Sequence, residues 1–151
     1  MVAQDRPPAP ARRGRGAEAI EAVEVEQRIA ARPATVFAYL TDPARFVEWM
    51  GVGAELDPTP GGAFRIDVDG EHFASGRFLE VDAPHRVVMT WGWEGSDTVH
   101  PGSTTVEITL VPDGDGTLLR LRHSELPSEE ERTNHREGWK RYVGTLATRL
   151  A

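Results

Sequence analysis

The sequence predicts an α+β fold in which one antiparallel sheet is covered by a long C-terminal helix. Three observations lead to this prediction. A first strand is followed at once by two short helices, then by about six consecutive strands joined through short turn sequences, and finally by a single long amphipathic helix. Strands that follow one another through tight turns pair as an antiparallel meander. The helix is the element able to cover the apolar face of such a sheet.

The first strand and the two short helices follow local rules. Apolar residues from Val23 to Ile29 alternate with charged ones, which is typical of a half-buried strand. Pro33 opens a helix that continues through Leu40, because proline suits the first helical position. Asp42 is the predicted N-cap of a second helix that begins at Pro43 and includes Trp49.

The central segment alternates with period two and is interrupted by turn residues. Asp69-Gly70 indicates a tight hairpin of the primed-turn type, and Gly76 indicates a bulge or sharp bend. The alternating runs that predict strands are residues 64–68, 72–81, 87–93, 106–110 and 119–123.

The last segment predicts the long helix. Ser128 is its expected N-cap, with Glu131 as the capping-box partner. Gly138 and Gly144 are costly in a helix interior, which predicts close packing of this helix against another surface. One apolar stripe consists of Trp139, Val143, Leu146 and Leu150, and His135 lies one turn earlier on it.

Composition limits the domain organisation and the partners. The 151 residues suit one domain. Residues 1–19 are rich in Pro, Gly and Arg and are expected to be a disordered basic tail, which leaves residues 20–151 as the folded domain. A net charge of −7 opposes nucleic-acid binding. The sequence has no cysteine, no apolar run long enough to span a membrane and no signal peptide, so a cytoplasmic location is expected.

Several segments resemble the SRPBCC superfamily, which includes START lipid-binding domains, polyketide cyclases and birch-pollen-allergen-like proteins. Within it they are similar to the branch named for the activator of the heat-shock protein 90 ATPase. The resemblance covers roughly residues 21–151, and His135-x-x-Gly138-Trp139, with GTLLRLRH before it, is fairly specific to this branch. The segments are PATVFAYLTDPARFVEWM, GGAFRI, VVMTWGWE, VEITLVPDGDGTLLRLRHSEL and HREGWKRYVGTL. The resemblance implies a helix-grip fold, with the curved sheet wrapped around the C-terminal helix above a hydrophobic ligand cavity.

Aromatic residues gather where such a cavity would lie. Trp91 and Trp93 belong to one strand, Trp139 faces them from the last helix, and Trp49 lies on the second short helix. Aromatic side chains serve both as core and as ligand wall, and both interpretations remain open. The candidate ligand-binding residues are Trp49, Phe64, Ile66, Met89, Trp91, Trp93, Leu121, His123, His135, Trp139 and Val143.

The five histidines show no spacing typical of a metal site, so no metal or cofactor is expected. His123 and His135 can meet across the cavity, either as general acid–base groups or as structurally paired side chains. There is no nucleophile elbow and no glycine-rich nucleotide loop.

Three functions therefore remain as expectations. The first is binding of a hydrophobic or amphipathic small molecule beneath the last helix, without catalysis. The second is a cyclase- or dehydratase-like enzyme that uses His123 or His135. The third is a chaperone-associated stress-response partner, which docks through its acidic surface. The eukaryotic activator that names the branch has an additional N-terminal domain, where this sequence has the basic tail.

Overall fold

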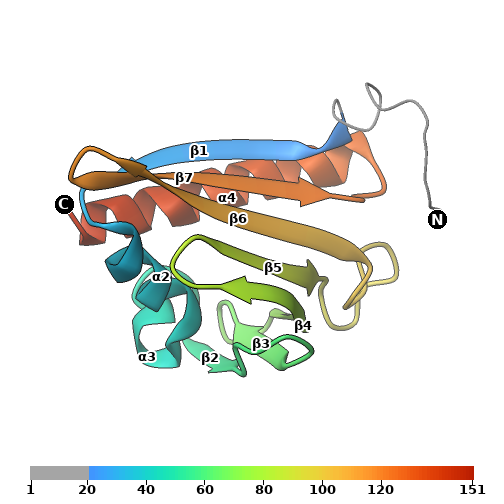
Figure 1. Cartoon of the computed structure of the whole chain (residues 1–151). Helices are drawn as coiled ribbons and strands as arrows, with labels where there is room; N and C mark the ends of the chain where they lie inside the picture. The colour runs from blue at the N-terminus through green and yellow to red at the C-terminus, as the bar shows by residue number, and fades with distance from the viewer. Residues whose placement is uncertain (1–20) are drawn as a thin grey trace.

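The computed structural model describes residues 21–151 of the chain. The predicted tail, residues 1–19, lies outside the described residues. Figure 1 shows a curved antiparallel sheet, with a long helix along one face and two short helices at one end. The predicted α+β class and element order are confirmed. The five alternating runs correspond to five of the six strands after the short helices, and the short strand Gly53–Leu56 lies outside them.

The sheet has seven strands in the order β1-β7-β6-β5-β4-β3-β2. All neighbouring strands pair antiparallel, and β1 closes onto β7, so that Val23 lies opposite His123. The strand bounds are β1 Val23–Ile29, β2 Gly53–Leu56, β3 Ala63–Asp67, β4 Phe73–Asp82, β5 Arg86–Trp91, β6 Thr104–Asp113 and β7 Gly116–Ser124.

Three helices complete the described part of the chain: α2 Pro33–Thr41, α3 Pro43–Phe46 and α4 Glu129–Arg149. The predicted caps are present, since the Asp42 side chain accepts from the Ala44 N–H and the Ser128 hydroxyl accepts from the Glu131 N–H. The Glu131 carboxylate does not complete a capping box but accepts a hydrogen bond from the Thr98 hydroxyl. This contact ties the start of α4 to the loop between β5 and β6.

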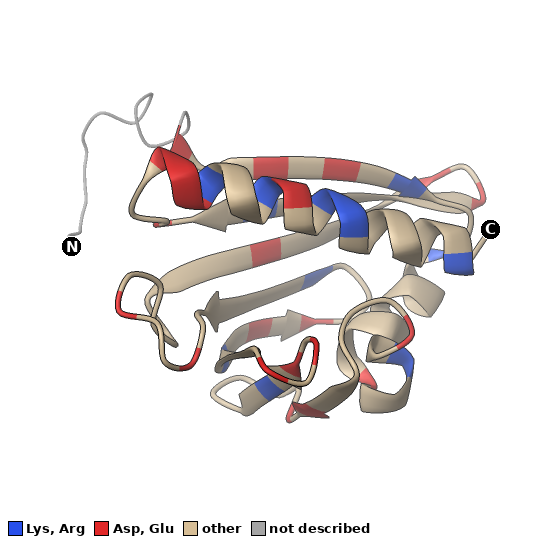
Figure 2. Cartoon of the chain, turned by 180° about the vertical axis from the view of Figure 1, so that it is seen from behind, with Lys and Arg blue, Asp and Glu red and all other residues tan. Residues whose placement is uncertain are grey.

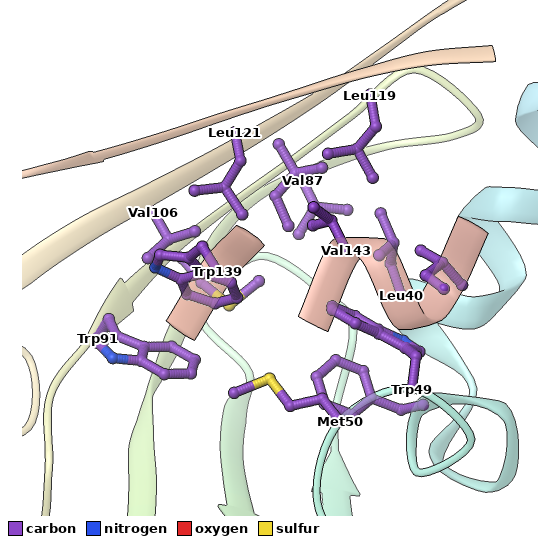
Figure 3. Close-up of a cluster of buried hydrophobic side chains, with 14 of the residues drawn as sticks. Leu40, Trp49, Met50, Val87, Trp91, Val106, Leu119, Leu121, Trp139 and Val143 are labelled. Carbon is purple, nitrogen blue, oxygen red and sulfur yellow. The ribbon is translucent and has the colours of Figure 1, made fainter. Parts of the chain in front are cut away.

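The core lies between the concave face of the sheet and α4. Trp139, Val143 and Leu146 of α4 are buried, as the apolar stripe predicts. Figure 3 shows the buried side chains of α4 facing Val87 and Val106 from the sheet, with Trp49 and Met50 closing the lower side. Much of the space beneath the helix is therefore filled by protein side chains.

Two predicted elements end earlier than expected. Helix α3 stops at Phe46, so Trp49 lies in the turn after it, where its indole N–H donates to the Tyr39 carbonyl at 2.8 Å. Strand β5 stops at Trp91, because Gly92 lies against the His100 carbonyl and a Cβ there would be 1.8 Å from that oxygen. Trp93 is instead attached to the sheet by an isolated bridge to Ala74.

Two predicted irregularities are placed differently. The bulge in β4 falls between Phe78 and Glu80, and Gly76 instead permits close approach to the Thr90 carbonyl. The hairpin after β3 is one residue longer than a two-residue turn, since the Val68 N–H donates to the His72 carbonyl. The Asp69 carboxylate stabilises this longer connection by accepting the N–H groups of the two residues that end it.

The glycines of α4 do not serve close packing, so that prediction is wrong. A Cβ added at Gly138 or at Gly144 would meet no atom within 4 Å. Both positions face open space beside the helix. Gly138 borders the largely apolar cavity described next, whereas Gly144 borders a separate polar groove.

Candidate ligand-binding site

A cavity of about 360 Å³ opens between α4 and the connection from β3 to β4. This volume is near the lower end of the range of ~300–1,000 Å³ typical of small-molecule sites. Its wall is largely apolar and its rim is polar. The lining residues are Met50, Val68, Asp69, His72, Trp91, Trp93, Asn134, His135, Gly138, Trp139, Arg141 and Tyr142.

The inner wall of the cavity is built from indole rings. Trp91 lies at its centre, with ring centroids 5.0 Å from Trp139 and 5.7 Å from Trp93. Behind it, Phe64 stacks on the Trp91 ring at 5.8 Å. Figure 3 shows Met50 extending toward Trp91 from the opposite side. Trp91, Trp139 and Met50 are each almost fully buried, so core packing holds the side chains that border the cavity in place and gives it a rigid apolar wall.

His123 lies directly behind this wall and is completely buried. Its Nδ1 accepts a hydrogen bond from the Trp139 indole N–H at 3.0 Å, which places the imidazole proton on Nε2. The Nε2–H then donates to the Thr104 hydroxyl at 2.8 Å, and that hydroxyl donates to the Trp91 carbonyl at 2.8 Å. A continuous chain of hydrogen bonds thus links α4 to β7, β6 and β5.

His135 has the opposite tautomer. Its Nε2 accepts from the Trp93 indole N–H at 3.0 Å, and its Nδ1–H donates to the Glu131 carbonyl at 2.8 Å. The two imidazole rings meet edge to face, with centroids 5.1 Å apart. Each histidine therefore fixes one tryptophan of the cavity wall.

Burial holds the pKa of His123 well below its ordinary value, and repulsion from His135 acts in the same direction. His123 is therefore neutral at physiological pH, with both ring nitrogens occupied. His135 also has both nitrogens occupied. A general acid or base needs a nitrogen within reach of the substrate, so this geometry favours the structural role for both residues.

The rim of the cavity carries an exposed ion pair. The Asp69 carboxylate accepts from His72 Nδ1 at 2.8 Å and also from the backbone N–H groups of Glu71 and His72. The hydrogen bond that His72 donates to Asp69 raises the pKa of His72. The pKa of Asp69 is lowered, chiefly by the backbone N–H of Glu71 and then by the bond from His72.

The candidate residues fall into two groups. Those that line the cavity are Trp91, Trp93, His135 and Trp139. Those that are buried in the core without lining it are Trp49, Phe64, Ile66, Met89, Leu121, His123 and Val143. The second group supports the wall but does not contact the open space.

Several lining residues were not predicted from the sequence. Asn134, Gly138 and Arg141 follow one another at intervals of four and three along α4, one row beside the apolar stripe. That spacing was available in the sequence and indicates one helix face. Tyr142 lies four residues after Gly138 and shares this signal. Met50 and Val68 gave no comparable signal, because their position depends on how distant segments meet.

Two classes of site have no counterpart in the described part of the chain. Among residues 21–151 there is no group of three or more His, Asp or Glu side chains placed to hold a metal ion. Within the same residues, no helix combines the length and the apolar character needed to cross a membrane.

Comparison with known families and with solved structures identifies the same family. The family described as Activator of Hsp90 ATPase homolog 1-like protein matches residues 30–151. An AHSA1-like protein from Rhizobium etli is 50% identical, with a TM-score of 0.67, and the match covers 83% of this chain and 79% of that one. No curated protein matches the sequence.

Two further solved structures share the fold. CalU16 from Micromonospora echinospora is 29% identical with a TM-score of 0.72, over 86% of this chain and 76% of that protein. DynU16, a protein of the dynemicin biosynthetic locus, is 27% identical with a TM-score of 0.77. That match covers 86% of this chain but 47% of DynU16, so the chain spans about half of that relative.

Proposed function

Because the chain belongs to the family of Activator of Hsp90 ATPase homolog 1-like proteins, in the SRPBCC superfamily of helix-grip folds, we propose that it binds a small molecule. The ligand is hydrophobic or amphipathic and occupies the cavity between α4 and the β3–β4 connection. The observation that carries this proposal is an open volume of about 360 Å³ whose wall consists of Trp91, Trp93, Trp139 and Met50. Displacing water from indole surface favours binding of an apolar group.

The structure of α4 offers a direct test. Gly138→Leu places an isobutyl group into the open cavity, whereas Gly144→Leu places the same group into a groove outside it. Both substitutions remove a glycine from a helix interior, which stabilises a helix by roughly 0.5–1 kcal/mol. The two variants therefore share their effect on helix stability and differ in the space that they fill.

We expect 4-phenylbutan-1-ol, a neutral probe, to change the tryptophan fluorescence of the chain in a saturable manner. Three of the four tryptophans line the cavity, so the signal reports on it. Gly138→Leu is expected to weaken binding at least about tenfold, and Gly144→Leu to leave it unchanged. The absence of a saturable signal, or an equal loss in both variants, would contradict the proposal.

A second candidate function is contact with a chaperone, which is supported by the family match. If the chain acts in this way, it is expected to accelerate ATP hydrolysis by purified Hsp90. Gly138→Leu is expected to preserve the acceleration, since the substitution changes the cavity and leaves the charged residues of the outer surface in place. This function is excluded if the ATPase rate of Hsp90 stays unchanged at concentrations of the chain that would saturate its binding to Hsp90.

A further inference from the structure

We propose, on the basis of the function proposed above, that the cavity selects amphipathic anions, with an apolar body in the indole-lined space and a carboxylate or similar head group at Arg141. The inference depends on an inventory of the polar groups around the cavity. Among the lining residues, the Asn134 amide and the Tyr142 hydroxyl are unpaired within the described part of the chain and can either donate or accept. The unpaired groups that only donate are the Trp91 indole and the Arg141 guanidinium, whereas the carboxylate on the rim already accepts three hydrogen bonds.

The first unused donor is inside the cavity wall. Trp91 is 1% exposed, and its indole N–H has no hydrogen-bond partner, the one such buried side-chain atom in residues 21–151. The other three indoles each have an acceptor, namely the Tyr39 carbonyl, His135 and His123. An unpaired buried donor costs free energy. A ligand atom that accepts this hydrogen bond recovers that cost only when neighbouring side chains move, because the Trp91 nitrogen is itself buried.

The second unused donor is on the rim. Arg141 forms no ion pair within the described part of the chain, and its guanidinium lies 5.2 Å from the centre of the Tyr142 ring. Arginines on the outer face of the sheet differ in this respect. Arg86 bonds both Glu80 and Glu107, and Arg122 lies between Glu24 and Glu107. Figure 2 shows that acidic residues colour the start of α4 and one position near its middle, whereas the charged residues after that position are all Lys or Arg.

The rim also carries one carboxylate, which does not offset Arg141 as an acceptor for a ligand. Asp69 receives hydrogen bonds from His72 and from two backbone N–H groups. A cationic head group meets a carboxylate whose Oδ1 accepts both backbone N–H groups and whose Oδ2 already accepts from His72, which leaves one acceptor position on Oδ2. An anionic head group meets an unpaired guanidinium, which binds carboxylates in a bidentate manner.

The net charge of −7 does not reverse this preference. Charges farther away than about 8–10 Å are largely screened at physiological ionic strength. The local groups at the mouth of the cavity therefore decide which head group is preferred.

Three probes that share a phenyl ring on a four-carbon chain and differ in the charge of the head group test the inference: 4-phenylbutanoate, 4-phenylbutan-1-ol and 4-phenylbutylamine. Their dissociation constants are measured by calorimetry on the full chain. We expect the carboxylate to bind about tenfold more tightly than the alcohol, and the amine more weakly than either. Arg141→Gln is expected to bring the carboxylate within about twofold of the alcohol. Lys140→Gln removes an adjacent exposed cation outside the cavity and should preserve the preference.

The outcomes separate the inference from the proposed function. If the alcohol binds in a manner blocked by Gly138→Leu, but the carboxylate binds no more tightly, the cavity binds ligands and the anion preference is wrong. The same conclusion follows if Arg141→Gln retains the full preference, or if the amine binds as tightly as the carboxylate. If none of the three probes binds, the proposed function and this inference both fail.

Discussion

His123→Ala is expected to destabilise the folded chain by about 3–5 kcal/mol, as large-to-small substitutions of buried rings do. The His123 side chain is completely buried and connects α4 with the sheet. Alanine leaves a cavity, and it also leaves the Trp139 indole N–H without its acceptor and the Thr104 hydroxyl without its donor. Both effects act in the same direction, since a buried donor without a partner adds its own cost.

Urea denaturation followed by tryptophan fluorescence measures this loss. His100→Ala is the matched control, because His100 is exposed and such surface changes stay within about ±0.5 kcal/mol. If His123→Ala prevents folding altogether, Thr104→Val provides a second measurement. It removes one hydroxyl from the same chain of hydrogen bonds and is expected to cost about 1–3 kcal/mol. Equal stability of the His123 and His100 variants would contradict the structural role.

The arrangement of the elements could be predicted because its signals are local. Alternation along each strand, the Asp42 and Ser128 caps and the stripe from Trp139 to Leu146 each depend on neighbouring residues. Where elements end was less predictable. Strand β5 stops before Trp93 because the loop after it returns to Gly92, and this contact joins segments that no local pattern connects.

The candidate site was predictable in part for the same reason. Inward-facing tryptophans could be identified by alternation, but alternation does not distinguish a residue that lines a cavity from one that packs behind it. Phe64 and Trp91 face the same interior and stack on each other, yet only Trp91 borders the open space beside α4. The meaning of Gly138 could not be predicted either, since a helical glycine indicates close packing as readily as an opening.

Acid is expected to destabilise the chain because of His123. In the unfolded chain this imidazole takes up a proton near pH 6.5, whereas burial holds its folded pKa well below that value. Below about pH 6.5 the unfolded state therefore binds more protons than the folded state. The contribution of His123 to the free energy of unfolding is fully present above that pH and decreases as the pH falls. The slope for one such group reaches at most about 1.4 kcal/mol per pH unit and ends at the folded pKa.

The measurement must separate His123 from groups with other pH dependences. His72 acts in the opposite direction, because its raised pKa gives stability below pH 6.5 that is lost as the pH rises, so the His72→Gln variant is the reference. Asp69 and Glu94 have lowered pKa values, so their contributions to stability are lost only as the pH falls below their ordinary values of 3.8 and 4.5, outside a window of pH 5–7. His135 is the titratable side chain in contact with His123 among the described residues, with Glu131 beside it. When His123→Gln is added to the His72→Gln variant, the free energy of unfolding should no longer decrease as the pH falls from 7 to 5. An unchanged pH dependence would show that another group causes it.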